Sequence, residues 1–420
     1  MLEGWHTFCL ISNESKLGGE EMEDYAVFRT PGTIHYGRKA FEKVGKETAA
    51  RGKKALIISD KVIQSLGFIS ECENFLQKEK MESVVYLGVE SEPTDKYVDE
   101  ALELFEKEQC DTIISLGGGS CIDTAKAVAV VQTNGGYIGD YMGGKKLAEK
   151  SPVPHISIPT TAGTGSEATD ATIITNTTNN VKMMIKQPAF MPDVAIVDPY
   201  LTVSSPPSVT AATGVDALSH AIEAYVSRRA QPMTDMLALS AMEKIVGSIR
   251  AAYEDGNNIS AREAMALGSL QAGMAFTNAS VCLVHGMSRP IGALFHVPHG
   301  FSNAMLLPAV LEFSKEASIN RLADLGRFFQ PNDSNLSDEI AADIAVEAVK
   351  NLCLELKIPN LKGWGIDQAA FETAISKMAE DALASGSPQN NPKVPSKQEI
   401  EELYLKCYDY KFNSENVVGS

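Results

Sequence analysis

Residues 111–126 read DTIISLGGGSCIDTAK, and this stretch decides the fold. The apolar run TIISLG predicts a buried strand, the glycines after it predict a tight turn, and the residues that follow predict a helix. In such a turn the backbone can approach a pyrophosphate, while the helix presents its positive N-terminal end. The motif is not GxGxxG, and glycines in a row can also form a tight turn without a ligand. The candidate phosphate-binding residues are Gly117, Gly118, Gly119 and Ser120.

Four similar runs surround this stretch and alternate with helical segments. They lie at 55–59, 83–89, 155–159 and 194–198. Strands that alternate with helices predict a parallel α/β sheet. Residues 94–109 place apolar side chains on one face at helical spacing, and Thr94 is a suitable cap, so we expect an amphipathic crossover helix there.

The character of the chain changes at 199–214, PYLTVSSPPSVTAATG, after which only helical patterns follow. We therefore expect an α/β domain at 1–205 and an all-helical domain at 206–420. Prolines are expected to break the helices, and 385–396 is expected to be an exposed loop. The prolines are Pro290, Pro298, Pro308, Pro331 and Pro359.

Composition narrows the classes of function. At 420 residues the chain suits two or three domains, and its formal net charge of -17 makes nucleic acid a poor partner. No run reaches the roughly 18 apolar residues of a membrane span, and the first residues lack the basic start and apolar core of an export signal. The seven cysteines are widely spaced and never form CxxC. We expect a cytoplasmic protein that binds neither nucleic acid nor membranes.

Two further features sit beside predicted strands. The polar turn at 159–169, PTTAGTGSEAT, follows the strand at 155–159 and offers hydroxyl groups, including those of Thr160 and Thr161. Asp60 follows the strand at 55–59, where an acidic group can accept hydrogen bonds from a ribose and repel a 2′-phosphate. A surface loop and a helix cap are the alternative interpretations of these two features.

The second half contains a candidate metal site. Asp216 and His220 are four residues apart in GVDALSHAIEAY and share one face of a predicted helix. His285, His296 and His299 follow within fifteen residues. Imidazoles and a carboxylate without a thiolate suit Fe²⁺ or Zn²⁺, between which the ligands do not choose.

The ordered motifs resemble the iron-containing (group III) alcohol dehydrogenases from about residue 25 to 410. They are GGGS with Asp123 and Lys126 after it, PTTAGTGSE, Lys182, AATGVDALSHAIEAY, and His285 and His299 spaced by fourteen with PHG closing the motif. The resemblance implies that the domain at 1–205 binds NAD, that the domain at 206–420 binds the metal and the substrate, and that cofactor and metal meet in the cleft between them. It implies that the metal ligands are Asp216, His220, His285 and His299. It implies that the NAD contacts are Asp60, Gly118, Gly119, Ser120, Asp123, Thr160, Thr161 and Lys182, with Asp60 favouring NAD over NADP.

Two positions depart from the family pattern. Many alcohol-active members carry a histidine where this chain has Arg289, and many carry an asparagine where it has Glu92. Arg289 could bind a substrate carboxylate or could pair with a protein acid. Glu92 puts one adenosine-side contact in doubt. His296 could serve as a substitute proton relay or could be an ordinary surface histidine.

The leading hypothesis is a metal-dependent NAD(H) oxidoreductase that interconverts a small alcohol or diol and its aldehyde or ketone. The first alternative is a hydroxy-acid dehydrogenase or hydroxyacid-oxoacid transhydrogenase that uses Arg289. A dehydroquinate synthase-like lyase is a second, and a nucleotide-binding assembly subunit with a structural metal is a third. The resemblance also implies a homodimer or larger homo-oligomer, and 25–36 could be an extended edge that pairs between subunits.

Overall fold

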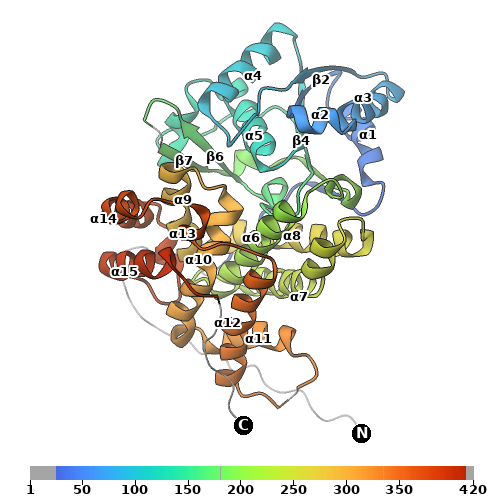
Figure 1. Ribbon diagram of the computed structural model, residues 1–420. Helices are drawn as coiled ribbons and strands as arrows, with labels where there is room; N and C mark the ends of the chain where they lie inside the picture. The colour runs from blue at the N-terminus through green and yellow to red at the C-terminus, as the bar shows by residue number, and fades with distance from the viewer. Residues whose placement is uncertain (1–24, 180, 334, 413–420) are drawn as a thin grey trace.

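The computed structural model describes residues 25–179, 181–333 and 335–412. Their N-terminal half is built on a six-stranded parallel sheet and their C-terminal half is helical (Figure 1), which confirms the predicted fold class. The strand order is β1-β8-β5-β4-β2-β3. The strands are β1 Thr33–Tyr36, β2 Lys54–Ile58, β3 Glu82–Tyr86, β4 Thr112–Gly117, β5 His155–Pro159 and β8 Val194–Val197.

Both faces of this sheet are covered by helices, which explains why its strands are continuous apolar runs. Because side chains alternate along a strand, Leu56 and Ile58 pack with the helices of one face, while Ala55 and Ile57 pack with those of the other. The helices of this half are α1 Val44–Ala49, α2 Lys61–Ser65, α3 Phe68–Lys78, α4 Asp95–Lys107 and α5 Gly119–Asn134. The predicted crossover helix is α4, and the side chain of Thr94 caps it by accepting from the backbone N–H of Tyr97.

The strand order reverses between β2 and β4, which is where open α/β sheets bind ligands at the carboxyl ends of their strands. Ile58 of β2 is in register with Ser115 of β4. The hydroxyl of Ser59 donates to the carbonyl of Leu116 at 2.6 Å and ties the two strand ends together. The glycine turn and Asp60 therefore leave the same edge of the sheet.

A hairpin that the sequence did not predict stands beside the main sheet. β6 (Ala171–Asn176) pairs antiparallel with β7 (Val181–Lys186). Met183 and Ile185 of β7 point into the core of the N-terminal half. Lys182 and Lys186 take the opposite side, so the hairpin presents two cations to one face.

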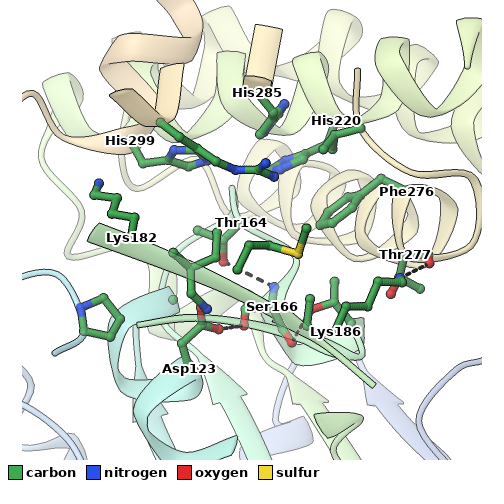
Figure 2. Close-up of a pocket in the computed structure, with 18 of the residues that line it drawn as sticks. Asp123, Thr164, Ser166, Lys182, Lys186, His220, Phe276, Thr277, His285 and His299 are labelled. Carbon is green, nitrogen blue, oxygen red and sulfur yellow. Dashed lines mark hydrogen bonds between the residues drawn. The ribbon is translucent and has the colours of Figure 1, made fainter. Parts of the chain in front are cut away.

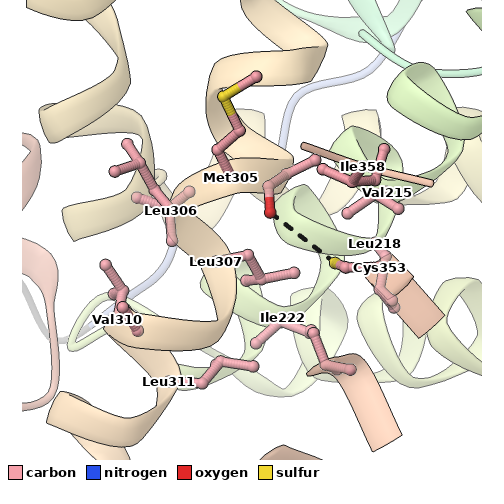
Figure 3. Packing of buried hydrophobic residues seen from close by; sticks show 14 of the residues in the cluster. Val215, Leu218, Ile222, Met305, Leu306, Leu307, Val310, Leu311, Cys353 and Ile358 are labelled. Carbon is pink, nitrogen blue, oxygen red and sulfur yellow. Dashed lines mark hydrogen bonds between the residues drawn. The ribbon is translucent and has the colours of Figure 1, made fainter. Parts of the chain in front are cut away.

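The helical half is organised around one buried helix, α6, which packs against α7, α8 and α10. Figure 3 shows Val215, Leu218 and Ile222 of α6 close to leucines of α10. The helices are α6 Pro207–Val226, α7 Pro232–Glu254, α8 Ile259–Ala279, α9 Leu283–Phe295, α10 His299–Ser314, α11 Ile319–Phe329, α12 Asp338–Glu355, α13 Leu361–Trp364, α14 Gln368–Ala384 and α15 Lys397–Tyr408. The short 3-10 helices are η1 Ala40–Lys43, η2 Ile138–Gly144, η3 Ser166–Ala168, η4 Pro188–Phe190, η5 Pro199–Thr202, η6 Lys315–Ala317 and η7 Ser387–Asn390.

Two prolines do not break helices as expected, because Pro290 lies inside α9 and Pro308 lies inside α10. A proline within a helix removes the hydrogen bond to the carbonyl four residues earlier. For Pro308 that carbonyl belongs to Ala304, and it accepts a weak hydrogen bond from Sγ of Cys353 at 3.8 Å, a contact drawn in Figure 3. Tertiary packing thus supplies a substitute partner.

The expectation of an exposed loop at 385–396 is also wrong for its first half. Ser387 and Asn391 are buried, and the amide of Asn391 donates to Ser314 at 2.9 Å. Gly286 gives Pro388 room, because a Cβ on that glycine would lie 2.7 Å from the proline ring. The segment therefore packs on α9.

No single helix in the described parts of the chain is long and apolar enough to cross a membrane. Helices α8 and α9 meet such a criterion only together, as a pair bent by 102°. The described cysteines are buried and unpaired, and Cys9 lies outside the described residues.

Candidate active site

A cavity of about 340 Å³ lies between the two halves of the chain. In Figure 2, His220, His285 and His299 lie on its helical side, and Asp123, Thr164 and Ser166 lie on the side of the sheet. The sequence-predicted residues among its lining are Gly119, Ser120, Asp123, Lys182, His220, His285, Arg289 and His299. The cavity therefore connects the glycine turn to the histidine cluster.

The candidate metal residues come from three helices. Asp216 and His220 lie one turn apart on α6, His285 lies in the first turn of α9, and His299 begins α10. One ligand atom from each residue can be chosen so that all four lie within 4.8 Å of one another. The rings of His220 and His285 are 4.3 Å apart, and those of His285 and His299 are 5.2 Å apart.

In the metal-free protein the protonation states of three of the four residues, His220, His299 and Asp216, suit a cation, whereas His285 holds a proton. Burial lowers the pKa of His220 to about 4 and that of His299 to about 3, so both imidazoles are neutral at pH 7 and can act as ligands. Burial alone would raise the pKa of Asp216, but the surrounding imidazoles outweigh it and hold that pKa well below its usual range. Burial would likewise lower the pKa of His285, but the charges of Glu223 and Asp216 raise it to about 9.

Two residues that the sequence did not single out complete the cluster. Glu223 is 3% exposed and contacts Nδ1 of His285 with Oε2, while Oε1 accepts from the backbone N–H of Val284 at 2.7 Å. The side-chain nitrogen of Asn303 lies 2.6 Å from Oδ1 of Asp216 and 3.0 Å from Nε2 of His285. Spacing could have suggested both, since Glu223 follows His220 on α6 by three residues and Asn303 follows His299 on α10 by four.

These residues fit a divalent first-row ion. The donor set is three imidazoles and one carboxylate, all partly or fully buried, and Nδ1 of His220 is buried without a hydrogen-bond partner among the described atoms. A carboxylate behind a ligand imidazole, as Glu223 stands behind His285, is the usual support of a metal-binding histidine.

The glycine turn opens α5 with no side-chain cap on the helix N-terminus, so its first N–H groups are free for an anionic ligand. The turn packs closely against the polar turn at 159–169. A Cβ on Gly119 would lie 2.9 Å from the side chain of Thr164, whereas one on Gly118 would meet no atom nearer than 3.9 Å. A Cβ on Gly119 would thus force the side chain of Thr164 to shift, and Gly118 keeps open space where a ligand could approach.

A buried charge network supports the polar turn. Nζ of Lys126 donates to Ser166 at 3.0 Å and to Thr169 at 2.8 Å, and burial lowers its pKa to about 8. Asp123 accepts from the backbone N–H of Ile173 at 2.8 Å and from Ser166. Asp123 therefore already connects α5 to β6 while one side of it faces the cavity.

Five of the predicted cofactor residues lie at the sheet edge rather than in the cavity lining: Asp60, Gly117, Gly118, Thr160 and Thr161. Oδ1 of Asp60 caps α2 by accepting from the N–H of Val62 at 2.8 Å, and its Oδ2 lies 3.7 Å from Sγ of Cys121. Asp60 therefore caps α2 and also lies beside the glycine turn, so its two interpretations do not exclude each other. Thr160 is buried and its N–H donates to the carbonyl of Gly117 at 3.0 Å, and the side chain of Thr161 would lie 3.9 Å from a Cβ on Gly118.

Lys182 and Glu92, which lie far apart in the sequence, form an ion pair at the cavity. A Cβ on Gly292 would lie 2.7 Å from Nζ of Lys182, so this side chain reaches from β7 to α9. Glu92 thus replaces the asparagine that many family members carry, and it also contacts Lys182, a predicted cofactor residue.

The two candidate catalytic residues have different positions. Arg289 lines the cavity one turn after His285, and its Nη1 donates to Oγ of Ser387 at 3.0 Å. His296 ends α9 in the left-handed conformation, is exposed, and is not among the residues that line the cavity. This placement argues against His296 as a proton relay.

Comparison with known families agrees with this geometry. Residues 31–199 match the model "Iron-containing alcohol dehydrogenase", and residues 210–408 match "Fe-containing alcohol dehydrogenase family, C-terminal".

Similar proteins cover nearly the whole chain. A protein of Citrobacter freundii described as 1,3-propanediol dehydrogenase is 38% identical over 92% of this chain and 99% of its own length. A Bacillus methanolicus protein described as NAD-dependent methanol dehydrogenase is 38% identical over 90% of this chain and 98% of its own length. A crystal structure of 1,3-propanediol oxidoreductase superposes with a TM-score of 0.87 at 36% identity, covering 91% of this chain and all of that one.

Proposed function

This chain belongs to the iron-containing alcohol dehydrogenase family, and we propose that it interconverts a small primary or secondary alcohol, or a diol, and its aldehyde or ketone. The observation that carries the proposal is the convergence of Asp216, His220, His285 and His299 at a cavity that extends to the N-terminus of α5. One site then offers ligands for a cation next to a place for a nucleotide phosphate.

We propose that the four converging residues hold a divalent ion, Fe²⁺ or alternatively Zn²⁺, and that NAD binds along the edge of the sheet. Asp60 favours NAD over NADP, because its carboxylate would repel a 2′-phosphate. The proposed NAD contacts are Asp60, Gly117, Gly118, Gly119, Ser120, Asp123, Thr160, Thr161 and Lys182.

In the reaction the carbinol carbon loses a hydride to NAD⁺ and the hydroxyl loses a proton, so that the products are the carbonyl compound, NADH and H⁺. When bound, the ion would supply Lewis-acid polarisation of the substrate oxygen. The chain's own residues orient the reactants. Phe276 stacks on His220 with ring centres 4.3 Å apart and, with Ile173 and Met184, gives the cavity an apolar wall that keeps water away from the reacting carbon.

The relatives support a small neutral substrate as the starting point. The printed names of two of them specify 1,3-propanediol and methanol, which are a short diol and a short primary alcohol. A cavity of about 340 Å³ has room for molecules of this size.

The proposal is tested by NADH formation with protein loaded anaerobically with Fe²⁺, NAD⁺ and a panel of primary alcohols, secondary alcohols, diols and hydroxy acids. We expect stoichiometric NADH from at least one of them and none after chelation of the metal. No NADH from any member, with NAD⁺ and metal both bound, would contradict the proposal and favour a transhydrogenase or a dehydroquinate synthase-like lyase, which regenerate their nicotinamide internally.

We also propose a homodimer or larger homo-oligomer, with a domain boundary near residue 205, between η5 and α6. β1 supports the first point, because it lies at the edge of the sheet and, among the described strands, pairs only with β8. Light scattering of the purified protein measures the oligomeric mass, and the mass of a monomer would contradict the proposed oligomer.

A further inference from the structure

Arg289 differs from the other cations of the cavity in having no acidic partner. Lys182 pairs with Glu92, and Lys186 pairs with Asp170 at 2.6 Å. For Arg289, no carboxylate of the described residues lies within ion-pair distance, and its hydrogen bond runs to the neutral hydroxyl of Ser387.

Arg289 as a whole is half-buried at the cavity, and part of its guanidinium is removed from water. Its Nε is buried without a partner among the described atoms. Burial lowers the pKa of Arg289 to about 10, against the opposing charge of Glu223, so the group stays positively charged at pH 7. Glu223 contacts His285 and makes no ion pair with Arg289, so the charge of Arg289 is only weakly compensated, and a ligand anion at the guanidinium would remove that cost.

The position of Arg289 suits recognition of a substrate. Arg289 follows His285 by four residues on α9, so the two side chains project from the same face one turn apart. Side chains at this spacing start about 5–6 Å apart, a distance that a chain of a few carbons can bridge. An oxygen at the histidine cluster and an anionic group at Arg289 could therefore belong to one short molecule.

Ser387 holds the guanidinium in place without neutralising it. The hydroxyl comes from η7, which packs on α9 where Gly286 admits Pro388. Asn391 anchors the end of this segment by donating to Ser314 at 2.9 Å. The planar fork of an arginine fixed in this way matches the two oxygens of a carboxylate.

We propose that Arg289 binds the carboxylate of a short hydroxy acid whose hydroxyl is oxidised at the histidine cluster. This inference rests on the proposed function and specifies its substrate class: the hydroxy acid and NAD⁺ give the oxo acid, NADH and H⁺. Ser387 acts as a positioning residue for Arg289.

The kinetic test compares alcohols of matched length, 3-hydroxypropanoate with 1,3-propanediol and 4-hydroxybutanoate with 1,4-butanediol. We expect kcat/KM to favour the acids in the native protein, and Arg289→Gln to reduce the acid-to-diol ratio about 10- to 100-fold. Ser387→Ala should reduce the ratio less, because it leaves the charge in place. Arg250→Gln, which removes an exposed arginine paired with Glu355, should leave it unchanged.

A ratio that is the same in native protein and Arg289→Gln would overturn the inference while leaving the proposed function intact. Since Arg289→Gln could fail to fold, Arg289→Lys provides a second variant, which keeps the charge but loses the fork and should retain part of the preference. A preference for 2-hydroxyethanesulfonate over both carboxylates would overturn the assignment to a carboxylate.

A binding experiment distinguishes a failure of this inference from a failure of the proposed function. Metal-free protein saturated with NADH is titrated with propanoate in a calorimeter, so that neither turnover nor a metal ion contributes. We expect the native protein to bind propanoate at least about 10-fold more tightly than Arg289→Gln. Equal affinity would overturn the inference, and a clear difference would support it even if no alcohol yielded NADH.

Discussion

Oε2 of Glu223 contacts Nδ1 of His285, and the Nε2 on the other side of the same ring faces Oδ1 of Asp216 at 3.6 Å. The contact fixes which nitrogen of His285 is turned toward the cluster. Because Oε1 of Glu223 also accepts from the backbone N–H of Val284, the carboxylate fixes the start of α9 as well as the ring. A histidine oriented in this way is a better ligand than a freely rotating one.

We therefore expect Glu223→Gln to weaken binding of Fe²⁺ or Zn²⁺ about 10- to 100-fold. Competition with a chelator of known affinity measures this directly. Glu355→Gln removes an exposed carboxylate and should leave metal affinity unchanged. Equal affinity in Glu223→Gln and native protein would show that the carboxylate does not orient the ligand.

The raised pKa of His285 predicts a pH dependence of the metal-free protein. The ordinary pKa is 6.5 and the folded value is about 9, so the folded state holds this proton more tightly. The resulting stability is fully present below pH 6.5 and is lost as the pH rises through about 9. Urea unfolding of metal-free protein across this range should show the decline, and Glu223→Gln should flatten it.

The same proton must leave when an ion binds Nε2, if Nδ1 keeps its hydrogen bond to Glu223. We expect release of about one proton per ion near pH 7.5 and progressively less above pH 9. Calorimetry in buffers of different ionisation enthalpy counts the protons. A count that does not change with pH would contradict the assignment.

The ion pair of Glu92 and Lys182 predicts an effect on the cofactor. If Lys182 contacts NAD, the carboxylate of Glu92 competes for the same ammonium and adds a negative charge near an anionic ligand. Glu92→Gln should lower the Kd for NAD⁺ about 2- to 10-fold at low salt, with a smaller change at high salt. Fluorescence titration measures the Kd, and Glu103→Gln, on the exposed face of α4, is the matched control. Weaker binding in Glu92→Gln would show that the pair positions Lys182 for the cofactor.

Close contact of two glycines joins the polar turn to the helical half. A Cβ on Gly273 of α8 would lie 2.7 Å from the carbonyl oxygen of Gly165. Gly273→Ala should lower the free energy of unfolding by about 1–3 kcal/mol through overpacking. Gly247→Ala, in α7 with no atom within 4 Å of its Cβ, should raise it by about 0.5–1 kcal/mol. Thermal unfolding distinguishes them, and equal shifts would contradict the packing argument.

Several features of the structure could be predicted from local sequence patterns alone. The five strands expected from apolar runs are present as β2, β3, β4, β5 and β8. Four of them are buried along almost their whole length and are therefore apolar, while β3 is a partly exposed edge strand. The i and i+4 spacing placed Asp216 and His220 on one helix face, and Thr94 caps α4. In each case the physical cause lies within a few residues of sequence.

Other features depended on contacts between distant segments. The β6–β7 hairpin stands apart from the main sheet. The packing of Met183 and Ile185 into the core of the N-terminal half stabilises it, and the local sequence does not predict that packing. Pro308 lies inside α10, and the carbonyl of Ala304 that it leaves without an N–H donor accepts instead from Cys353, 49 residues from Ala304.

By itself, the sequence determined the fold class, the glycine turn after β4 and the residue types of the histidine cluster, because periodicity, turn chemistry and ligand preference are local properties. Only the tertiary structure decided that Glu223 supports His285, that Glu92 pairs with Lys182, and that Ser387 rather than an acid meets Arg289. These contacts join segments far apart in the chain, and long-range packing, which no short stretch of sequence encodes, brings them together.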